Sequence, residues 1–141
     1  ITESDITYRI RNDVGLKVKD VMTRSVFFVN EDDKLANVAR MLAVGPYRKL
    51  PVVNNGFLVG VVTPFDVIKH LNETKQLSDI RTSNTKISKV MNSFVTSIHP
   101  NADVADAVTL MRRKNISGLP VTEEDSLVGI ITERDIIEAM R

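Results

Sequence analysis

Apolar residues recur along this chain with the spacing of amphipathic helices in two places. Such a helix repeats its apolar side chains at positions i, i+3, i+4 and i+7. Two segments follow this pattern, namely Leu35, Val38, Ala39 and Leu42, and then Val104, Ala107, Val108 and Met111. We expect each helix to follow a short apolar strand, over residues 26–29 and 95–98, and the first helix to end at Gly45-Pro46.

A β-hairpin is predicted after each of these helices. The four expected strands are rich in β-branched residues and cover residues 50–53, 57–62, 119–122 and 127–131. Asn54-Asn55-Gly56 joins the first pair and tolerates positive φ angles, and residues 123–126 join the second pair. The strands are apolar on both faces, so we expect their sheets to be covered on both sides. A closing helix is predicted over residues 64–71 and 133–140.

The chain contains this pattern twice, because residues 17–71 recur as residues 86–140 without an insertion or deletion. The clearest matches are Val21-Met22 with Val90-Met91, and Leu50-Pro51-Val52 with Leu119-Pro120-Val121. A unit of about 55 residues is marginally stable alone, so we expect the two to pack together. The sequence therefore predicts an α/β fold of two β-α-β-β-α motifs, over 17–71 and 86–141, joined by a polar linker at 72–85.

Residues 1–16 form a separate N-terminal segment. Its first six residues, Ile-Thr-Glu-Ser-Asp-Ile, nearly copy residues 131–136, which read Ile-Thr-Glu-Arg-Asp-Ile. One interpretation is that the chain begins at the tail of a preceding copy, inside a parent protein with more motifs, for example four. The alternative is a chance match at the start of a helix.

Composition argues against several classes of function. Lysine and arginine total 19 against 18 acidic residues, so the net charge of +1 does not indicate binding to polyanions. The absence of cysteine excludes disulfides, thiolate metal sites and cysteine nucleophiles, and fits a reducing compartment. No apolar run approaches the roughly 20 residues that span a bilayer. No pattern indicates a catalytic nucleophile with its base. We expect a cytoplasmic protein that is not an enzyme and needs no cofactor or metal.

Each hairpin ends in Gly, two β-branched residues and then Thr-x-x-Asp at the start of a helix. The pairs are Thr63 with Asp66 and Thr132 with Asp135. One interpretation is purely structural, because a Thr N-cap with an acid three residues later is a capping box, and Pro64 suits the first helical position. The other is functional, because a helix start attracts phosphate and a carboxylate there can accept both hydroxyls of a ribose.

Taken in order and twice, the Val-Met starts, the Leu-Pro-Val strands and the Gly-x-x-Thr-x-x-Asp ends resemble CBS motifs. The pair resembles a Bateman module, and the resemblance covers residues 17–140. It implies an α+β sandwich in which two motifs pack sheet to sheet about a pseudo-twofold axis, leaving two clefts. In this family the clefts commonly take adenosine-containing ligands such as AMP, ADP, ATP or S-adenosylmethionine. The resemblance therefore implies a regulatory ligand-binding module.

The same resemblance suggests a role for nine residues. Asp66 and Asp135 would hold ribose hydroxyls, and Thr63 and Thr132 would contact ribose or phosphate. The residues before each Leu-Pro-Val would line the clefts, namely Arg48-Lys49 and Ser117-Gly118. Arg48 and Lys49 could pair a phosphate or form a solvated start of the strand. Arg134 could reach a phosphate or face water.

Two other functions remain open at this stage. Paired CBS motifs often form homodimers, so the chain could be a structural assembly module without a ligand. Binding to nucleic acid is known for some members of the family, but the near-zero net charge and the few aromatic residues argue against it. In the regulatory interpretation, we expect a homodimer of CBS pairs whose output passes to a fused or partner effector protein.

Overall fold

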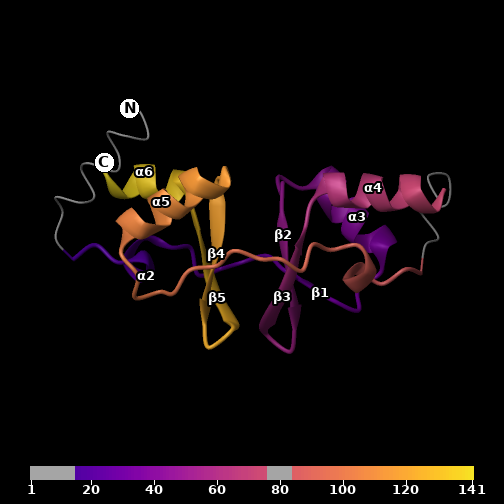
Figure 1. The fold of residues 1–141 in the computed structure, drawn as a ribbon, viewed down its shortest axis with the longest axis horizontal. Coiled ribbons are helices and arrows are strands. Elements are labelled where there is room, and N and C mark those ends of the chain that lie inside the picture. The colour runs from indigo at the N-terminus through magenta and orange to yellow at the C-terminus, as the bar shows by residue number, and fades with distance from the viewer. Residues whose placement is uncertain (1–14, 76–83) are drawn as a thin grey trace. The chain divides into compact units, whose positions relative to one another are not determined.

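The computed structural model describes residues 15–75 and 84–141, which form helices and strands in an α/β fold (Figure 1). Nearly all of the predicted segment 1–16 and most of the predicted linker 72–85 lie outside the described residues. The elements in chain order are α2 (Val18–Val21), β1 (Val29–Asn30), α3 (Leu35–Val44), β2 (Leu50–Asn54), β3 (Phe57–Val62), α4 (Pro64–Thr74), the 3₁₀ helix η2 (Ile87–Lys89), α5 (Val104–Lys114), β4 (Gly118–Glu123), β5 (Ser126–Thr132) and α6 (Glu133–Ala139).

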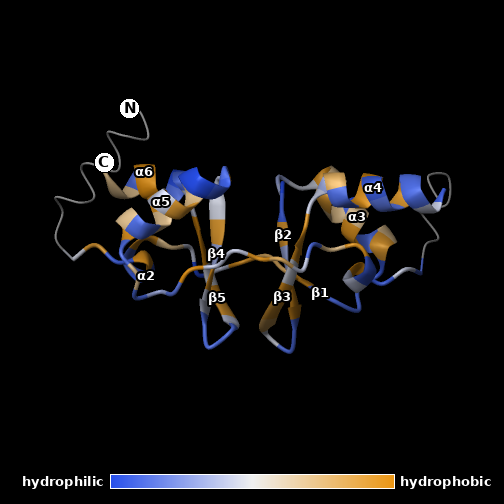
Figure 2. Ribbon diagram, in the orientation of Figure 1, coloured by the Kyte–Doolittle hydropathy of each residue, from blue (hydrophilic) through white to orange (hydrophobic). Residues whose placement is uncertain are grey.

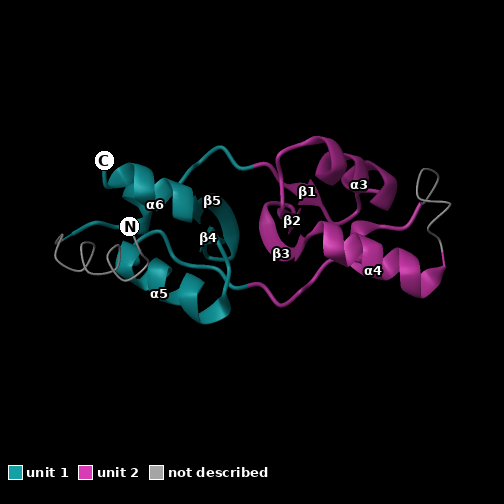
Figure 3. Cartoon of the chain, turned by 90° about the horizontal axis from the view of Figure 1, so that it is seen from above, with its two compact units in different colours: residues 1–26, 96–141 teal, residues 27–95 magenta. Residues whose placement is uncertain are grey.

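The chain divides into two compact units (Figure 3). Unit 2 is continuous and consists of Phe27–Val95, whereas unit 1 combines Ile1–Val26 with Thr96–Arg141. These units do not coincide with the two sequence motifs. The first ten residues of each motif, 17–26 and 86–95, belong to the unit built on the other motif, and we call them the exchanged segments.

Unit 2 is built on the hairpin of β2 and β3. The strands are antiparallel, with Leu50 opposite Val62, and β1 pairs with β2 in parallel. Asn55 and Gly56 close the hairpin at φ angles of 52° and 87°, which asparagine and glycine tolerate best. Helices α3 and α4 contact each other. The buried core collects apolar residues from all these elements and from one exchanged segment, namely Val29, Leu35, Val38, Leu42, Leu50, Val52, Val62, Val67, Leu71, Ile87 and Val90.

Unit 1 repeats this plan on the hairpin of β4 and β5. Gly118 lies opposite Thr132 at one end of the hairpin, and Glu124 and Asp125 form its turn with positive φ angles. Figure 2 shows apolar residues along the strands and polar residues at the hairpin tips. Helix α5 contacts β4, and α6 contacts β5. Its buried core consists of Val18, Ile98, Val104, Ala107, Val108, Met111, Leu119, Val121, Ile131 and Ile136.

Backbone hydrogen bonds attach each exchanged segment to its unit. In unit 1, Thr23 and Ile130 exchange two bonds of 2.8 and 2.9 Å. In unit 2, the corresponding residues Asn92 and Val61 exchange two bonds of the same lengths. Each exchanged segment therefore runs beside the second strand of a hairpin, which is β5 in unit 1 and β3 in unit 2. The helix that begins with the Thr-x-x-Asp pair follows directly after that strand.

The predicted helices and hairpins are confirmed, but the predicted short strands are largely wrong. The strand expected over residues 26–29 is reduced to Val29–Asn30, because only these two residues pair with β2. The strand expected over residues 95–98 is reduced to a single bridge between Ile98 and Val121. The short helices α2 and η2 in the exchanged segments were not predicted, since three or four residues are too few to show a helical period.

Candidate functional site

The start of α4 forms a polar corner in unit 2, which we call the α4 corner (Thr63 and Asp66). Asp66 Oδ2 accepts hydrogen bonds from the Thr63 backbone N–H at 2.9 Å and from Thr63 Oγ1 at 3.0 Å. The Asp66 N–H donates to Thr63 Oγ1 at 3.2 Å, which completes a capping box. Pro64 follows Thr63 at the first helical position, where its missing N–H costs nothing.

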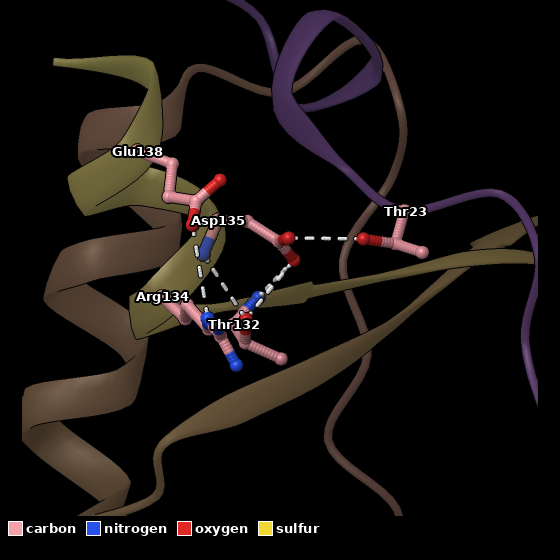
Figure 4. A network of polar contacts seen from close by, with 5 residues as sticks. All are labelled: Thr23, Thr132, Arg134, Asp135 and Glu138. Atoms are coloured by element: carbon pink, nitrogen blue, oxygen red, sulfur yellow. Dashed lines mark hydrogen bonds and ion pairs between the residues drawn. The ribbon is translucent and has the colours of Figure 1, made fainter. Parts of the chain in front are cut away.

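The start of α6 forms the equivalent α6 corner in unit 1 (Thr132 and Asp135). Its capping box has the same three bonds, with lengths of 2.9, 3.0 and 3.2 Å. Asp135 accepts a fourth bond, because Thr23 Oγ1 donates to its Oδ1 atom at 2.9 Å (Figure 4). Among the described residues of unit 2, no side chain donates to Asp66 Oδ1 in this way. The structural interpretation of both corners is therefore correct, and each carboxylate also keeps acceptor positions that the capping box does not use.

Four of the nine predicted site residues meet at the α6 corner. Gly118 pairs with Thr132 across the hairpin, and a Cβ atom added at Gly118 would lie 3.3 Å from Thr132 Cγ2. The Glu133 N–H, at the first position of α6, donates to the Ser117 carbonyl oxygen at 3.0 Å. Ser117-Gly118, at the start of β4, and the Thr132–Asp135 pair, where β5 passes into α6, are therefore neighbours.

Arg48 and Lys49 occupy the corresponding positions in unit 2. Lys49 comes directly before Leu50, which pairs with Val62, so it lies at the α4 end of the hairpin. Pro64 has no N–H, so the bond that Glu133 makes in unit 1 cannot form here. Arg48 is exposed, whereas Lys49 is half-buried and its pKa is lowered from the usual 10.5 because burial disfavours the charged ammonium. The unit 2 hairpin thus carries two basic residues, Arg48 and Lys49, at the end beside α4. The matching positions of the unit 1 hairpin, beside α6, hold the uncharged Ser117 and Gly118.

Arg134 lies on the exposed side of the first turn of α6. Its side chain is 88% exposed, and its Nε atom lies 3.7 Å from Glu138 Oε1 in an i,i+4 ion pair (Figure 4). An ion pair this exposed contributes little to stability. The Arg134 side chain thus faces solvent, beside Glu138 on the next turn of α6.

The methionine of each exchanged segment packs closely against the glycine that precedes a corner by three residues. A Cβ atom added at Gly60 would lie 2.5 Å from Met91 Sδ and 3.0 Å from the Asn92 carbonyl oxygen. One added at Gly129 would lie 2.8 Å from Met22 Sδ and 3.0 Å from the Thr23 carbonyl oxygen. The glycine that opens each Gly-x-x-Thr-x-x-Asp pattern is therefore required by the close packing of the Val-Met segment.

Thr23 is the site residue that sequence reasoning missed. It follows Val21-Met22, and the matching residue after Val90-Met91 is Asn92, so both copies place a hydrogen-bonding residue here. This shared polarity was a usable signal. The role of this polar position becomes clear only from the structure, which places Thr23 beside the α6 corner.

The described residues also bear on metal binding and on membrane insertion. Over residues 15–75 and 84–141, His, Asp and Glu side chains do not gather in groups of three or more that could hold a metal ion. Within the same ranges, no helix has the length and apolar character needed to cross a bilayer.

Comparison with known proteins places this geometry in a family. The sequence model of the CBS domain matches residues 18–73 and 87–141. The archaeal protein MJ1225 of Methanocaldococcus jannaschii is 29% identical over 98% of the chain, and the chain spans only 52% of its length. Its crystal structure, described as that of a proposed archaeal homologue of γ-AMPK, matches with a TM-score of 0.79, covering 100% of this chain and 54% of that one.

Two similar solved structures contain adenosine compounds. CBSX2 in complex with AMP matches with a TM-score of 0.75 and 25% identity, covering 89% of this chain and 96% of that chain. The CBS domain pair of MJ0100, in complex with 5′-methylthioadenosine and S-adenosyl-L-methionine, matches with a TM-score of 0.67 and 27% identity, covering 88% and 94%. With both motifs matched by the family model, this chain belongs to the CBS-domain family and carries a tandem pair of CBS motifs.

Proposed function

We propose that this chain is a regulatory module that binds an adenosine-containing ligand, with a corner carboxylate holding the ribose hydroxyls. The proposal rests on the hydrogen bonding of the Asp66 carboxylate. Its Oδ2 atom is held by Thr63, and its Oδ1 atom accepts no hydrogen bond from the described residues. A carboxylate oriented by its own helix start and half-open to solvent is suited to accept hydroxyl groups. The adenosine ligands of CBSX2 and MJ0100 support the choice of ligand class.

The charge around the two corners favours a phosphate near α4. Arg48 and Lys49 lie at the α4 end of the unit 2 hairpin, whereas Ser117 and Gly118 hold the same positions in unit 1 without charge. An anionic ligand would also offset the unfavourable burial of the Lys49 ammonium. We therefore expect AMP, ADP and ATP to bind more tightly at the α4 corner, and the α6 corner to bind AMP more weakly and to suit less charged adenosyl compounds.

Binding would act on a partner through the arrangement of the two motifs. A ligand shifts such an equilibrium only by its differential affinity for the two arrangements. The output would pass to a fused or partner effector in the cytoplasm. As a regulatory module, the chain would carry out no catalytic step itself.

The direct test is a titration of purified protein with AMP, ADP, ATP and S-adenosylmethionine, followed by calorimetry. We expect Asp66→Ala to weaken binding of the preferred nucleotide about tenfold or more, since each hydrogen bond to a charged acceptor contributes about 1.5–3 kcal/mol. Asp66→Asn keeps an acceptor for the capping box and should lose affinity with less effect on stability. Glu73→Ala removes an exposed acid from the last turn of the same helix and should bind normally. Unchanged affinity in both Asp66 variants would contradict the ribose role.

A second candidate function is assembly without a ligand. Helix α4 carries two large apolar side chains one turn apart, and Phe65 and Ile68 are 70% and 59% exposed. Exposed apolar residues at this spacing fit a helix face that packs against a second copy. The same ligand panel separates the two functions, because a ligand that binds the folded state raises the unfolding midpoint. No shift with any ligand, together with a dimeric mass in light scattering, would favour assembly.

A further inference from the structure

The two corners have the same capping box but different numbers of open acceptor positions. An ionised carboxylate offers about four positions for hydrogen bonds, two on each oxygen. At Asp66, the N–H and hydroxyl of Thr63 both donate to Oδ2, so the described residues leave both positions on Oδ1 open. At Asp135, Thr132 uses Oδ2 in the same way and Thr23 takes one position on Oδ1. The described residues then leave one open position at Asp135.

The difference arises from one residue of each exchanged segment. Thr23 and Asn92 occupy matching positions, and each makes the same pair of backbone bonds to the strand beside it. The Thr23 hydroxyl points to Asp135, as Figure 4 shows. The Asn92 side chain instead accepts the Phe94 backbone N–H at 2.9 Å, which turns its amide back onto its own loop. Asn92 therefore leaves Asp66 open while Thr23 partly occupies Asp135.

We infer that Thr23 makes the two corners select for different numbers of ligand hydroxyls, an inference that rests on the proposed function. The α4 corner accepts both hydroxyls of a vicinal diol, as in a ribonucleoside. The α6 corner accepts one hydroxyl, because a second would have to displace Thr23 from Asp135. Thr23 is thus a specificity-determining residue, and the α6 corner discriminates poorly between ribose and deoxyribose.

The test compares AMP with 2′-deoxy-AMP and 3′-deoxy-AMP on the full chain, using NMR to follow each corner separately. The backbone amides of Thr63 and Thr132 are suitable reporters, since each donates to the carboxylate of its own corner at 2.9 Å. At the Thr63 reporter we expect either deoxy compound to bind about tenfold or more weakly than AMP, the cost of one hydrogen bond to a charged group. At the Thr132 reporter we expect less than a threefold difference.

Three variants complete the test. Thr23→Val keeps the shape of the side chain and removes the hydroxyl, so the Thr132 reporter should gain the tenfold preference for AMP. Asn92→Thr places a hydroxyl at the matching position in unit 2 and should reduce the preference at the Thr63 reporter. Ser25→Ala removes another exposed hydroxyl from the same exchanged segment and should change neither ratio. A loss of stability alone would weaken the binding of AMP and of the two deoxy compounds equally, so it would leave the affinity ratios unchanged.

The outcomes separate this inference from the function on which it rests. Equal AMP preference at the two reporters in the unaltered protein, or an unchanged ratio in Thr23→Val, would overturn the inference while leaving nucleotide binding in place. If none of the three nucleotides moves either reporter in any variant, the proposed function itself fails and the inference fails with it.

Discussion

Among single residues, Lys49 has the environment with the clearest pH dependence. Burial lowers its pKa below the usual 10.5, because the ammonium loses hydration. Between the lowered pKa and 10.5, the unfolded chain binds more protons than the folded protein, so this residue makes stability rise with pH across that window. Below the window the side chain is charged in both states, and the folded state bears the full desolvation penalty.

Lys49→Met should therefore raise the thermal midpoint at pH 7, and its advantage should shrink as the pH approaches 10.5. Circular dichroism melts at several pH values between 7 and 10 measure both effects. Arg48→Met is the matched control, since Arg48 is exposed and should show no comparable dependence on pH. A less stable Lys49→Met at pH 7 would mean that the contacts of the ammonium outweigh its desolvation.

At the scale of elements, much of the structure could be predicted from local pattern. Apolar spacing located α3 and α5, and the Asn-Asn-Gly turn located the first hairpin, because these signals lie within a few neighbouring residues. The capping boxes at Thr63 and Thr132 were equally visible. The hydrogen bond from Thr23 to Asp135 could not be predicted in this way, because it joins residues 112 positions apart. It forms only because an exchanged segment packs in the other unit, which the spacing of apolar residues does not indicate.

The packing of an exchanged segment against β3 gives a prediction at this scale. Gly60→Ala would place a methyl group against Met91 and the Asn92 carbonyl, and the carbonyl cannot move without weakening the hydrogen bond that it accepts from the Val61 N–H. We expect a loss of about 1–3 kcal/mol in the free energy of unfolding, measured by urea denaturation. Adding Met91→Ala should recover part of this loss, since it removes the nearest of the clashing atoms. A Gly60→Ala protein of normal stability would show that the segment packs more loosely than the structure indicates.

At the scale of the whole molecule, the exchange of segments separates the sequence repeat from the folding unit. Sequence comparison within the chain aligns Val21-Met22 with Val90-Met91 but does not show which core receives either segment. The two cores are built from residues at matching positions of the repeat, so the repeat itself does not tell one core from the other. The structure places Val18 in the core of unit 1 and Ile87 with Val90 in the core of unit 2.

This arrangement predicts which fragment of the chain folds. Residues 27–95 contain the whole buried core of unit 2, including Ile87 and Val90, on one continuous piece of chain. Residues 17–71 match the sequence motif but lack both of these residues. We expect fragment 27–95 to unfold cooperatively in urea, with a lower midpoint than the full chain, because a unit of this size is marginally stable. Fragment 17–71 should show no cooperative transition.

Ile87→Ala in fragment 27–95 provides the matched control for this comparison. Ile87 is fully buried, and replacing such a residue by alanine typically costs about 2–5 kcal/mol. That cost is comparable to the entire stability expected of so small a unit, so the substituted fragment should lose its transition as well. A folded 17–71 fragment, or a 27–95 fragment indifferent to Ile87→Ala, would mean that each motif completes its own core. The exchanged segments would then add packing to the units without defining them.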